Sequence, residues 1–156
     1  MRQIEDLSHA STAERVFFPG FLQRLLSAID APAGLVWSTF VSGQVVPLAE
    51  RGLSQTSYRL NAHSDQMNGS LLQEAHRQGK PLMFGAGETD PRPTPTDHLY
   101  VVSPLMTGTN CLGFLEILQR PDTDPLARPG YLQFIDQMGG HATAYMQKRA
   151  GREKFN

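Results

Sequence analysis

Residues 98–119 constrain the fold more than any other stretch of this 156-residue chain, and they read HLYVVSPLMTGTNCLGFLEILQ. Two runs rich in β-branched and large apolar residues flank Gly108-Thr109-Asn110, an arrangement that predicts two strands joined by a tight turn. A similar pair of runs at residues 34–52 flanks Ser42-Gly43-Gln44 and predicts a second hairpin. Because hairpins join antiparallel strands, we expect a mainly antiparallel sheet.

Three other segments have the spacing of amphipathic helices. The first precedes the sheet, and we expect Pro19 to break or restart it. Its stripe consists of Phe18, Phe21, Leu22, Leu25, Leu26 and Ile29. The second covers residues 64–79 and is expected to end at Gly79, since Pro81 follows closely. The third closes the chain with a stripe of Tyr131, Phe134, Ile135, Met138, Ala142, Tyr145 and Met146.

The order of these elements predicts an α+β domain. Residues 81–87, PLMFGAG, add a strand, and residues 57–61 are a further short extended candidate, so the central antiparallel sheet has five or six strands. The N- and C-terminal helices are expected to pack on one face of this sheet. The helix of residues 64–79 and the proline-rich loop 85–97 are expected to cover the other face.

Composition excludes several classes of function. The length suits one domain, and the formal net charge of -1 without a basic block gives no footprint for nucleic acid. A single cysteine forbids an internal disulfide and fits a reducing compartment. No apolar run approaches the roughly 18 residues of a membrane span, and the N-terminus is polar where a signal peptide would be apolar. We therefore expect a cytoplasmic domain without membrane insertion.

Three parts of the chain together resemble a GAF domain, a small sensor and dimerisation module related to PAS domains. They are LLQEAHRQGKPLMF at residues 71–84, VVSPLMTGTNCLGFLEILQR at residues 101–120, and the closing amphipathic helix. The resemblance covers residues 14–148 and leaves 1–13 as an N-terminal extension and 149–156 as a C-terminal tail or linker start. The stretch from Glu116 to Met138 is also similar to GAF-like segments that precede efflux membrane-fusion domains.

The resemblance also says which ligand signatures this sequence lacks. Bilin-binding GAF domains attach their pigment through a cysteine in the loop before the second hairpin, and residues 85–97 contain none. A methionine sulfoxide reductase of GAF type would need a second cysteine to resolve the first. Phosphodiesterase GAF domains carry Asn-Lys where this chain has Gln119-Arg120. We therefore name no cofactor, and we expect Cys111 to be a small buried core residue and Arg120 a solvated charge.

The remaining polar residues form no catalytic or metal-binding pattern. The five histidines have no H-x-x-x-H spacing, and no serine stands in a G-x-S-x-G motif. Glu116 alternates with apolar residues on its strand, so it is either a polar group in a pocket or, as we expect, a solvated carboxylate at a strand edge. Candidates for lining a pocket between the sheet and its cover are Trp37, Phe84, His98, Tyr100 and Ser103, which are otherwise core or loop residues.

These observations favour a non-catalytic sensor or regulatory module that binds an unidentified small ligand or pairs with itself. It would belong to a larger signalling or transport-linked protein. The alternatives are an enzyme on a GAF scaffold and a vestigial scaffold domain. The antiparallel terminal helices would bring Phe17 and Phe18 close to Tyr145 and Met146, leaving an apolar patch. We therefore expect a homodimer that buries this patch.

Overall fold

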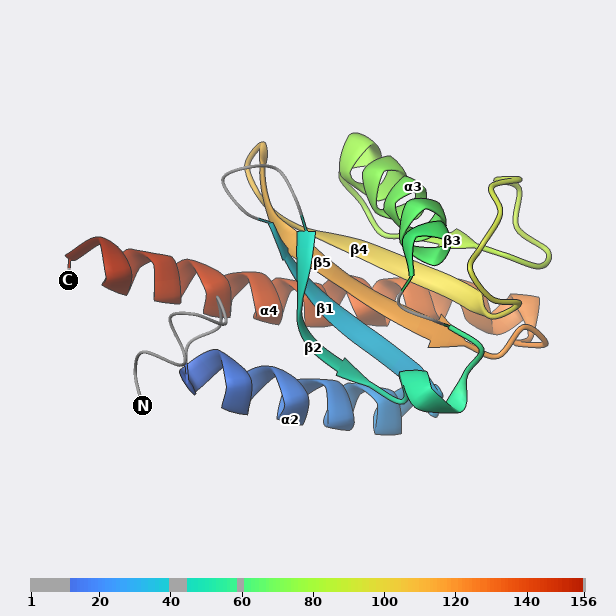
Figure 1. Cartoon of the computed structure of the whole chain (residues 1–156), viewed down its shortest axis with the longest axis horizontal. Helices are drawn as coiled ribbons and strands as arrows, with labels where there is room; N and C mark the ends of the chain where they lie inside the picture. The colour runs from blue at the N-terminus through green and yellow to red at the C-terminus, as the bar shows by residue number, and fades with distance from the viewer. Residues whose placement is uncertain (1–11, 40–44, 59–60, 156) are drawn as a thin grey trace.

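The structure, a computed structural model, describes residues 12–39, 45–58 and 61–155 (Figure 1). Within these residues a five-stranded antiparallel sheet has the strand order β2-β1-β5-β4-β3. Its strands are β1 (Ala33–Thr39), β2 (Val45–Arg51), β3 (Leu82–Phe84), β4 (Leu99–Thr107) and β5 (Asn110–Gln119). The predicted α+β class with a central antiparallel sheet is confirmed, and β5 is its middle strand.

Both predicted hairpins are present. Strands β4 and β5 pair from Leu99 opposite Gln119 to Thr107 opposite Asn110, so the turn contains only Gly108 and Thr109. Gly108 has a φ of 60°, which glycine adopts without strain. Strands β1 and β2 pair antiparallel, while their predicted turn at 42–44 lies outside the described residues.

The prediction of a sixth strand at residues 57–61 is wrong for residues 57, 58 and 61, which are not in a strand. Residues 59–60 lie outside the described part of the chain. Here the short helix η1 (Leu53–Gln55) leads toward helix α3 (Ala62–Gln78). Asn61 caps α3, because its side chain accepts a hydrogen bond of 2.9 Å from the backbone N–H of Ser64. Residue 61 is therefore the start of a helix rather than the end of a strand.

Helix α2 (Thr12–Ile29) runs through Pro19 without a break, which corrects the prediction that this proline interrupts it. Proline removes one backbone hydrogen bond, but the residues on both sides of it are held by packing. Phe18 before it and Leu22 after it are both fully buried against the sheet. Burial of this apolar face on the scaffold offsets the lost hydrogen bond.

Helices α2 and α4 (Arg128–Phe155) pack side by side on one face of the sheet, as predicted (Figure 1). The 3-10 turn η2 (Pro125–Ala127) leads into α4. Residues of α2, α4, β1, β4 and β5 form one apolar core on this face. The rings of Phe17 and Tyr145 stack with centroids 4.0 Å apart, which confirms the predicted proximity of the two helix ends.

Helix α3 covers the opposite face (Figure 1). It ends at Gly79, whose φ of 67° closes the helix, as the sequence predicts. A second apolar core lies between α3 and the sheet and includes Leu71, Leu72 and Ala75 from the helix. In the described part of the chain, no helix combines the length and apolar character that crossing a bilayer requires.

Candidate functional site

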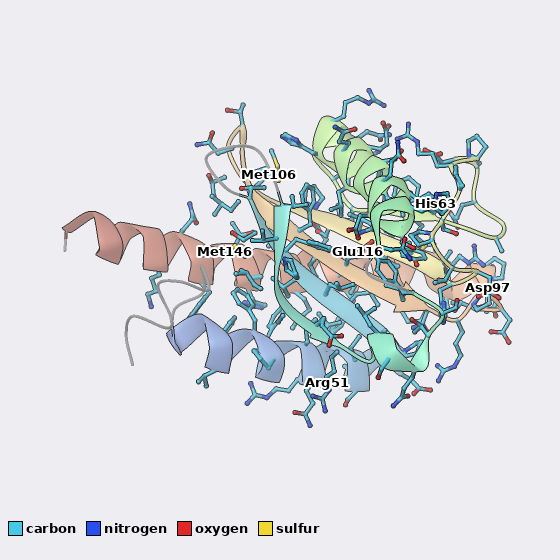
Figure 2. All side chains as sticks on the ribbon, viewed as in Figure 1. Arg51, His63, Asp97, Met106, Glu116 and Met146 are labelled. Carbon is cyan, nitrogen blue, oxygen red and sulfur yellow. The ribbon has the colours of Figure 1, made fainter. Side chains whose placement is uncertain are left out.

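A carboxylic acid lies fully buried between α3 and the sheet. Glu116 is on the middle strand β5, with β1 on one side and β4 on the other, and its exposed fraction is 0%. Figure 2 shows it beneath α3. The expectation of a solvated carboxylate is therefore wrong, because β5 is not an edge strand and α3 excludes water from this face. The alternative, a polar group in a pocket, is nearer, but Glu116 is closed off from both of the hollows described below.

Two donors from different elements meet at one oxygen of Glu116. The indole Nε1 of Trp37 on β1 donates a hydrogen bond of 2.8 Å to Oε1. The side-chain Nδ2 of Asn68 on α3 donates another of 3.0 Å to the same atom. Asn68 is only 2% exposed. This polar trio, formed by Trp37, Asn68 and Glu116, joins the cover helix to two strands.

The trio has more acceptors than donors. Glu116 Oε2 and Asn68 Oδ1 are both buried, and neither accepts a hydrogen bond from the described part of the protein. Burial raises the pKa of Glu116 from its usual 4.5 to about 7, although the hydrogen bonds from Asn68 and Trp37 act in the opposite direction. The carboxyl group is therefore poised to change charge near neutral pH.

Two tyrosines lie close to the trio. Burial raises the pKa of Tyr58 well above its usual range, and the nearby Glu116 adds to this effect. Burial likewise raises the pKa of Tyr100, whose hydroxyl group exchanges a 2.9 Å hydrogen bond with Thr96 Oγ1. Both phenols stay neutral at physiological pH, so the surroundings of Glu116 contribute hydrogen-bonding groups without adding tyrosinate charge.

Two adjoining hollows open along α3 beside the trio. The larger, named the α3 cleft, has a volume of about 950 Å³. Its lining comprises Thr39, Val45, Asp65, Gln66, Gly69, Ser70, Leu72, Gln73, His76, Thr109, Asn110, Cys111 and Phe114. The smaller, named the Trp37 hollow, has about 340 Å³ and is lined by Trp37, Val45, Pro47, Asp65, Asn68, Gly69 and Leu72. Both volumes fall in the range of small-molecule sites.

The predicted pocket residues divide between three environments. Trp37 lines the smaller hollow. Phe84 and Tyr100 are fully buried in the core beneath α3, which corresponds to the core alternative. His98 is half-buried beside the loop, where its Nδ1 lies 2.8 Å from Thr96 Oγ1. Phe84, Tyr100 and His98 line neither hollow.

Ser103 lies on the wrong face for the predicted pocket. Its Oγ is 3.0 Å from the position that a Cβ on Gly139 of α4 would occupy, so its side chain faces the terminal helices. Its neighbours in alternation, Val101 and Leu105, belong to that same core. Side chains alternate along a strand, so Ser103 and Tyr100, three positions apart, cannot face the same side of a regular strand.

Sequence reasoning missed Asn68, although the chain contains a signal for it. Asn68, Leu71, Leu72 and Ala75 stand at i, i+3, i+4 and i+7, so the asparagine occupies a position on the apolar face of α3. All four residues are buried. A polar side chain in such a position, opposite a glutamate on the inward face of a strand, indicates a buried polar pair.

Cys111 is half-buried and lines the α3 cleft, so the prediction of a buried core residue holds only in part. Burial raises the pKa of its thiol, and its Sγ contacts the carbonyl oxygen of Gly113 at 3.3 Å. A raised pKa lowers the thiolate fraction at neutral pH and hence the reactivity. Within the described residues, no three His, Cys, Asp or Glu side chains are placed to hold a metal ion.

The two residues at the Asn-Lys position of phosphodiesterase GAF domains have structural contacts here. Gln119 is buried and donates from Nε2 to the carbonyl oxygen of Ile29 at 3.1 Å, which holds the end of α2. Arg120 donates to the carbonyl oxygen of Asp30. Its side chain is half exposed, in line with the expected solvated charge. Neither residue lines either hollow.

Two arginines form hydrogen bonds that attach the loop 85–97 to helices α3 and α4. Arg92 donates from Nη2 to Glu74 Oε1 of α3 at 3.1 Å. Arg128, the first residue of α4, is 7% exposed and donates from Nη1 to Glu88 Oε2 at 2.8 Å and to the carbonyl oxygen of Ala86 at 2.7 Å. The loop therefore contacts both the cover helix and the terminal helix on the other side of the sheet.

Several solved structures with this architecture are GAF domains. The second GAF domain of DevS from Mycobacterium smegmatis aligns with a TM-score of 0.64 at 15% identity, covering 92% of this chain and 99% of that one. The blue-light absorbing form of the PixJ GAF domain from Thermosynechococcus elongatus gives 0.65 at 11% identity, with 92% and 90% covered. The GAF domain of a phosphoenolpyruvate-protein phosphotransferase from Coxiella burnetii gives 0.58 at 17% identity, with 96% and 94% covered.

These similarities establish the fold, as the resemblance in sequence implied. No protein-family model matches the chain, and no curated protein matches it. The identities stay at 17% or below, so ligands and partners do not transfer from these structures.

Proposed function

We propose, on the premise that the chain has the fold of a GAF domain, that it is a non-catalytic sensor or regulatory module that binds a small molecule beneath α3. The observation that carries this proposal is the pair of adjoining hollows beside the polar trio. The Trp37 hollow combines apolar and aromatic walls with the buried Asn68, as ligand sites do, and the α3 cleft adds polar side chains at the surface. The module would act within a larger signalling or transport-linked protein in the cytoplasm.

A non-catalytic role is favoured over an enzymatic one by the chemistry of the lining. Catalysis by a nucleophile needs an activated side chain with a base beside it. The thiol in the α3 cleft has a raised pKa and contacts a backbone carbonyl rather than a base. The fully buried carboxyl group is already hydrogen-bonded to Trp37 and Asn68. A module that only binds a ligand and transmits a conformational change needs neither an activated nucleophile nor a base beside it.

The test uses a glycine that borders both hollows. Gly69 of α3 lines the α3 cleft and the Trp37 hollow, and no heavy atom lies within 4 Å of a Cβ placed on it. Gly69→Leu should therefore fill the hollows without disturbing the fold, since leucine also favours a helix. Gly140→Leu on α4 is the matched control, because Gly140 also has open space around it but lies across the sheet.

A fragment screen by NMR on the three proteins reads out binding. We expect fragments that shift amide resonances of α3 and β1 in the wild type. They should lose at least about tenfold in affinity in Gly69→Leu and retain it in Gly140→Leu. Hits that bind Gly69→Leu as well as the wild type would place the ligand site elsewhere. A screen without any hit would count against a ligand-binding role.

We further propose a homodimer built on α2 and α4. Helix α4 has 28 residues and α2 has 18, so at 1.5 Å per residue α4 is longer by about 15 Å. The patch is smaller than expected, because Phe18 is fully buried and Phe17 stacks on Tyr145. Val16, next to them in sequence, is nevertheless 72% exposed. An exposed valine beside an overhanging helix supports pairing of two copies here.

Light scattering at about 100 µM protein tests the dimer. We expect the mass of two chains for the wild type and of one chain for Val16→Asp. Leu126→Asp is the matched control, since Leu126 is 89% exposed but lies on η2, outside both helices. A monomeric wild type at this concentration, or equal masses for both variants, would exclude pairing through α2 and α4.

A further inference from the structure

Two acceptor oxygens of the trio lack hydrogen-bond donors in the described part of the chain, and this indicates the chemical class of the ligand. Each oxygen of a carboxyl group and of a side-chain amide can accept hydrogen bonds, yet Glu116 Oε2 and Asn68 Oδ1 accept none from the described residues. A buried acceptor without a donor costs free energy comparable to a lost hydrogen bond. Asn68 Oδ1 would gain from a partner that brings N–H groups, and Glu116, once ionised, would gain from a positive charge nearby.

The Trp37 hollow brings such a partner next to Trp37 and Asn68 of the trio, while Glu116 is fully buried behind them. Trp37 and Asn68, two of the three members, form part of its wall, and the third member is hydrogen-bonded to both. Asp65 adds a second acid at this hollow, on the exposed side of α3. Val45, Pro47 and Leu72 give the hollow an apolar side. A compact ligand can therefore place its body against apolar groups and its polar end toward Asn68.

Charge favours a cation over an anion at this place. Of the described residues that line the Trp37 hollow, Asp65 carries a charge and none is a lysine, arginine or histidine, and Glu116 lies behind them. An anion would be repelled by Asp65 and by the ionised Glu116, and no described lining residue would compensate with a positive charge. A cation gains from the acids and from the indole face of Trp37, since tryptophan is the most favourable aromatic residue for cation–π contacts.

We infer that the Trp37 hollow recognises a small organic cation rich in N–H donors, of the amidinium, guanidinium or amine class, through Asn68 in its wall and through the negative charge of the buried Glu116 behind Asn68. This inference rests on the proposed function and specifies its ligand. The apolar part of the ligand lies against Val45, Pro47 and Leu72. Asp65 contributes long-range attraction from the opening of the hollow.

The inference predicts how binding depends on pH. Glu116 has a pKa of about 7, raised by burial, so its carboxyl group gains negative charge as the pH rises through neutrality. Tyr58, Tyr100 and Asp65 face the same region, and the raised pKa values of both tyrosines keep them neutral in this interval. Affinity for a permanent cation should therefore rise between about pH 6 and pH 8.

Three probes of nearly equal shape separate charge from size. Benzamidine carries an aromatic body and a cationic group with four N–H donors, benzamide is its neutral counterpart, and benzoate is the anion. Trp37 is the only tryptophan of the chain, so quenching of its fluorescence reports binding at the hollow itself. We expect saturable quenching by benzamidine, at least about tenfold weaker binding of benzamide, and none by benzoate.

Two variants test whether the charge of Glu116 contributes to binding. Glu116→Gln removes the charge at nearly constant volume. It should lower the affinity for benzamidine by about tenfold or more and abolish the rise of that affinity with pH. Asp136→Asn on α4 is exposed, removes the same charge from the chain, and should leave both unchanged. The ranking of the three probes on the wild type needs no variant, so it tests the inference even if Glu116→Gln does not fold.

The outcomes distinguish this inference from the proposed function. Benzoate binding as tightly as benzamidine, no saturable binding of benzamidine, or benzamidine affinity unchanged in folded Glu116→Gln would each overturn the inference. The proposed function would still stand if fragments of other chemistry bound the wild type and lost affinity in Gly69→Leu. It would fail together with the inference only if no fragment of any charge bound beneath α3.

Discussion

The indole Nε1 of Trp37 donates a 2.8 Å hydrogen bond to the buried carboxyl group of Glu116, a residue 79 positions later in the chain. This bond crosses from β1 to β5, and Asn68 of α3 completes the polar trio from above. A buried polar group with this connectivity fixes how the cover helix sits on the sheet. The trio is therefore a structural link, and two of its members, Trp37 and Asn68, line the hollow that we propose as a ligand site.

The first prediction concerns pH. The pKa of Glu116 rises from 4.5 in the unfolded chain to about 7 in the folded one, so the folded state holds its proton more tightly. The resulting stability is fully present below about pH 4.5 and is lost as the pH rises through about 7. With 1.36 kcal/mol for each pH unit, the loss is on the order of 3 kcal/mol. Urea unfolding at a series of pH values measures it.

Glu116→Gln is the control for this titration. Subtracting its free energy of unfolding from that of the wild type removes the contributions of all other groups. The difference should fall across the interval between about pH 4.5 and 7 and stay constant above it. A flat difference would mean that the carboxyl group keeps its ordinary pKa in the folded protein.

The second prediction tests the close pairing of β1 and β5. A Cβ on Gly113 would lie 2.0 Å from the carbonyl oxygen of Trp37, which is a backbone atom and cannot move aside cheaply. Gly113→Ala should therefore destabilise the protein by more than about 2 kcal/mol. Gly140→Ala in α4, where a Cβ meets nothing within 4 Å, should stabilise it by up to about 1 kcal/mol. Chemical denaturation of both variants checks the contrast, and equal effects would contradict it.

The third prediction concerns the attachment of loop 85–97 to α4. Arg128 is buried and donates to Glu88 and to the carbonyl oxygens of Ala86 and Thr123. Arg128→Met leaves these acceptors without their donor and should cost about 2–4 kcal/mol. Glu88→Gln keeps an acceptor for the arginine and should cost less. Hydrogen exchange should show faster exchange at residues 85–88 in Arg128→Met, and equal protection in both variants would refute the role of this arginine.

The fourth prediction concerns Cys111. Burial raises the pKa of its thiol, so alkylation by iodoacetamide at pH 7 should be slower than that of a cysteine in an unstructured peptide and should accelerate as the pH rises. Cys111→Ser should change the free energy of unfolding by less than about 1 kcal/mol. A wild-type rate above that of the peptide at neutral pH would indicate an activated thiol and reopen the enzymatic alternative.

Local signals in the sequence predict the individual elements well. The hairpin over 98–119 is marked by two apolar runs and a glycine turn, and the end of α3 is marked by Gly79 and Pro81. Both depend on residues that are close in the chain. Pro19 is the exception, because the packing of Phe18 and Leu22 against a distant sheet keeps α2 continuous.

The site was harder to predict because it depends on pairing between distant strands. Glu116 is buried because β1 pairs with β5, which makes β5 a middle strand, and no local pattern gives that order. Ser103 was placed with Tyr100 on one face although three positions separate them on β4. Asn68 carried a usable signal, since it stands among the apolar residues of α3.

The most direct test of cation recognition in the Trp37 hollow is the indole N–H resonance of Trp37 in an NMR titration with benzamidine. The chain has a single tryptophan, so the signal needs no assignment, and this N–H is the group that binds Glu116. We predict a saturable shift of this resonance in the wild type that is lost in Gly69→Leu and kept in Gly140→Leu. An indole resonance that does not move, or that moves equally in all three proteins, would contradict the account.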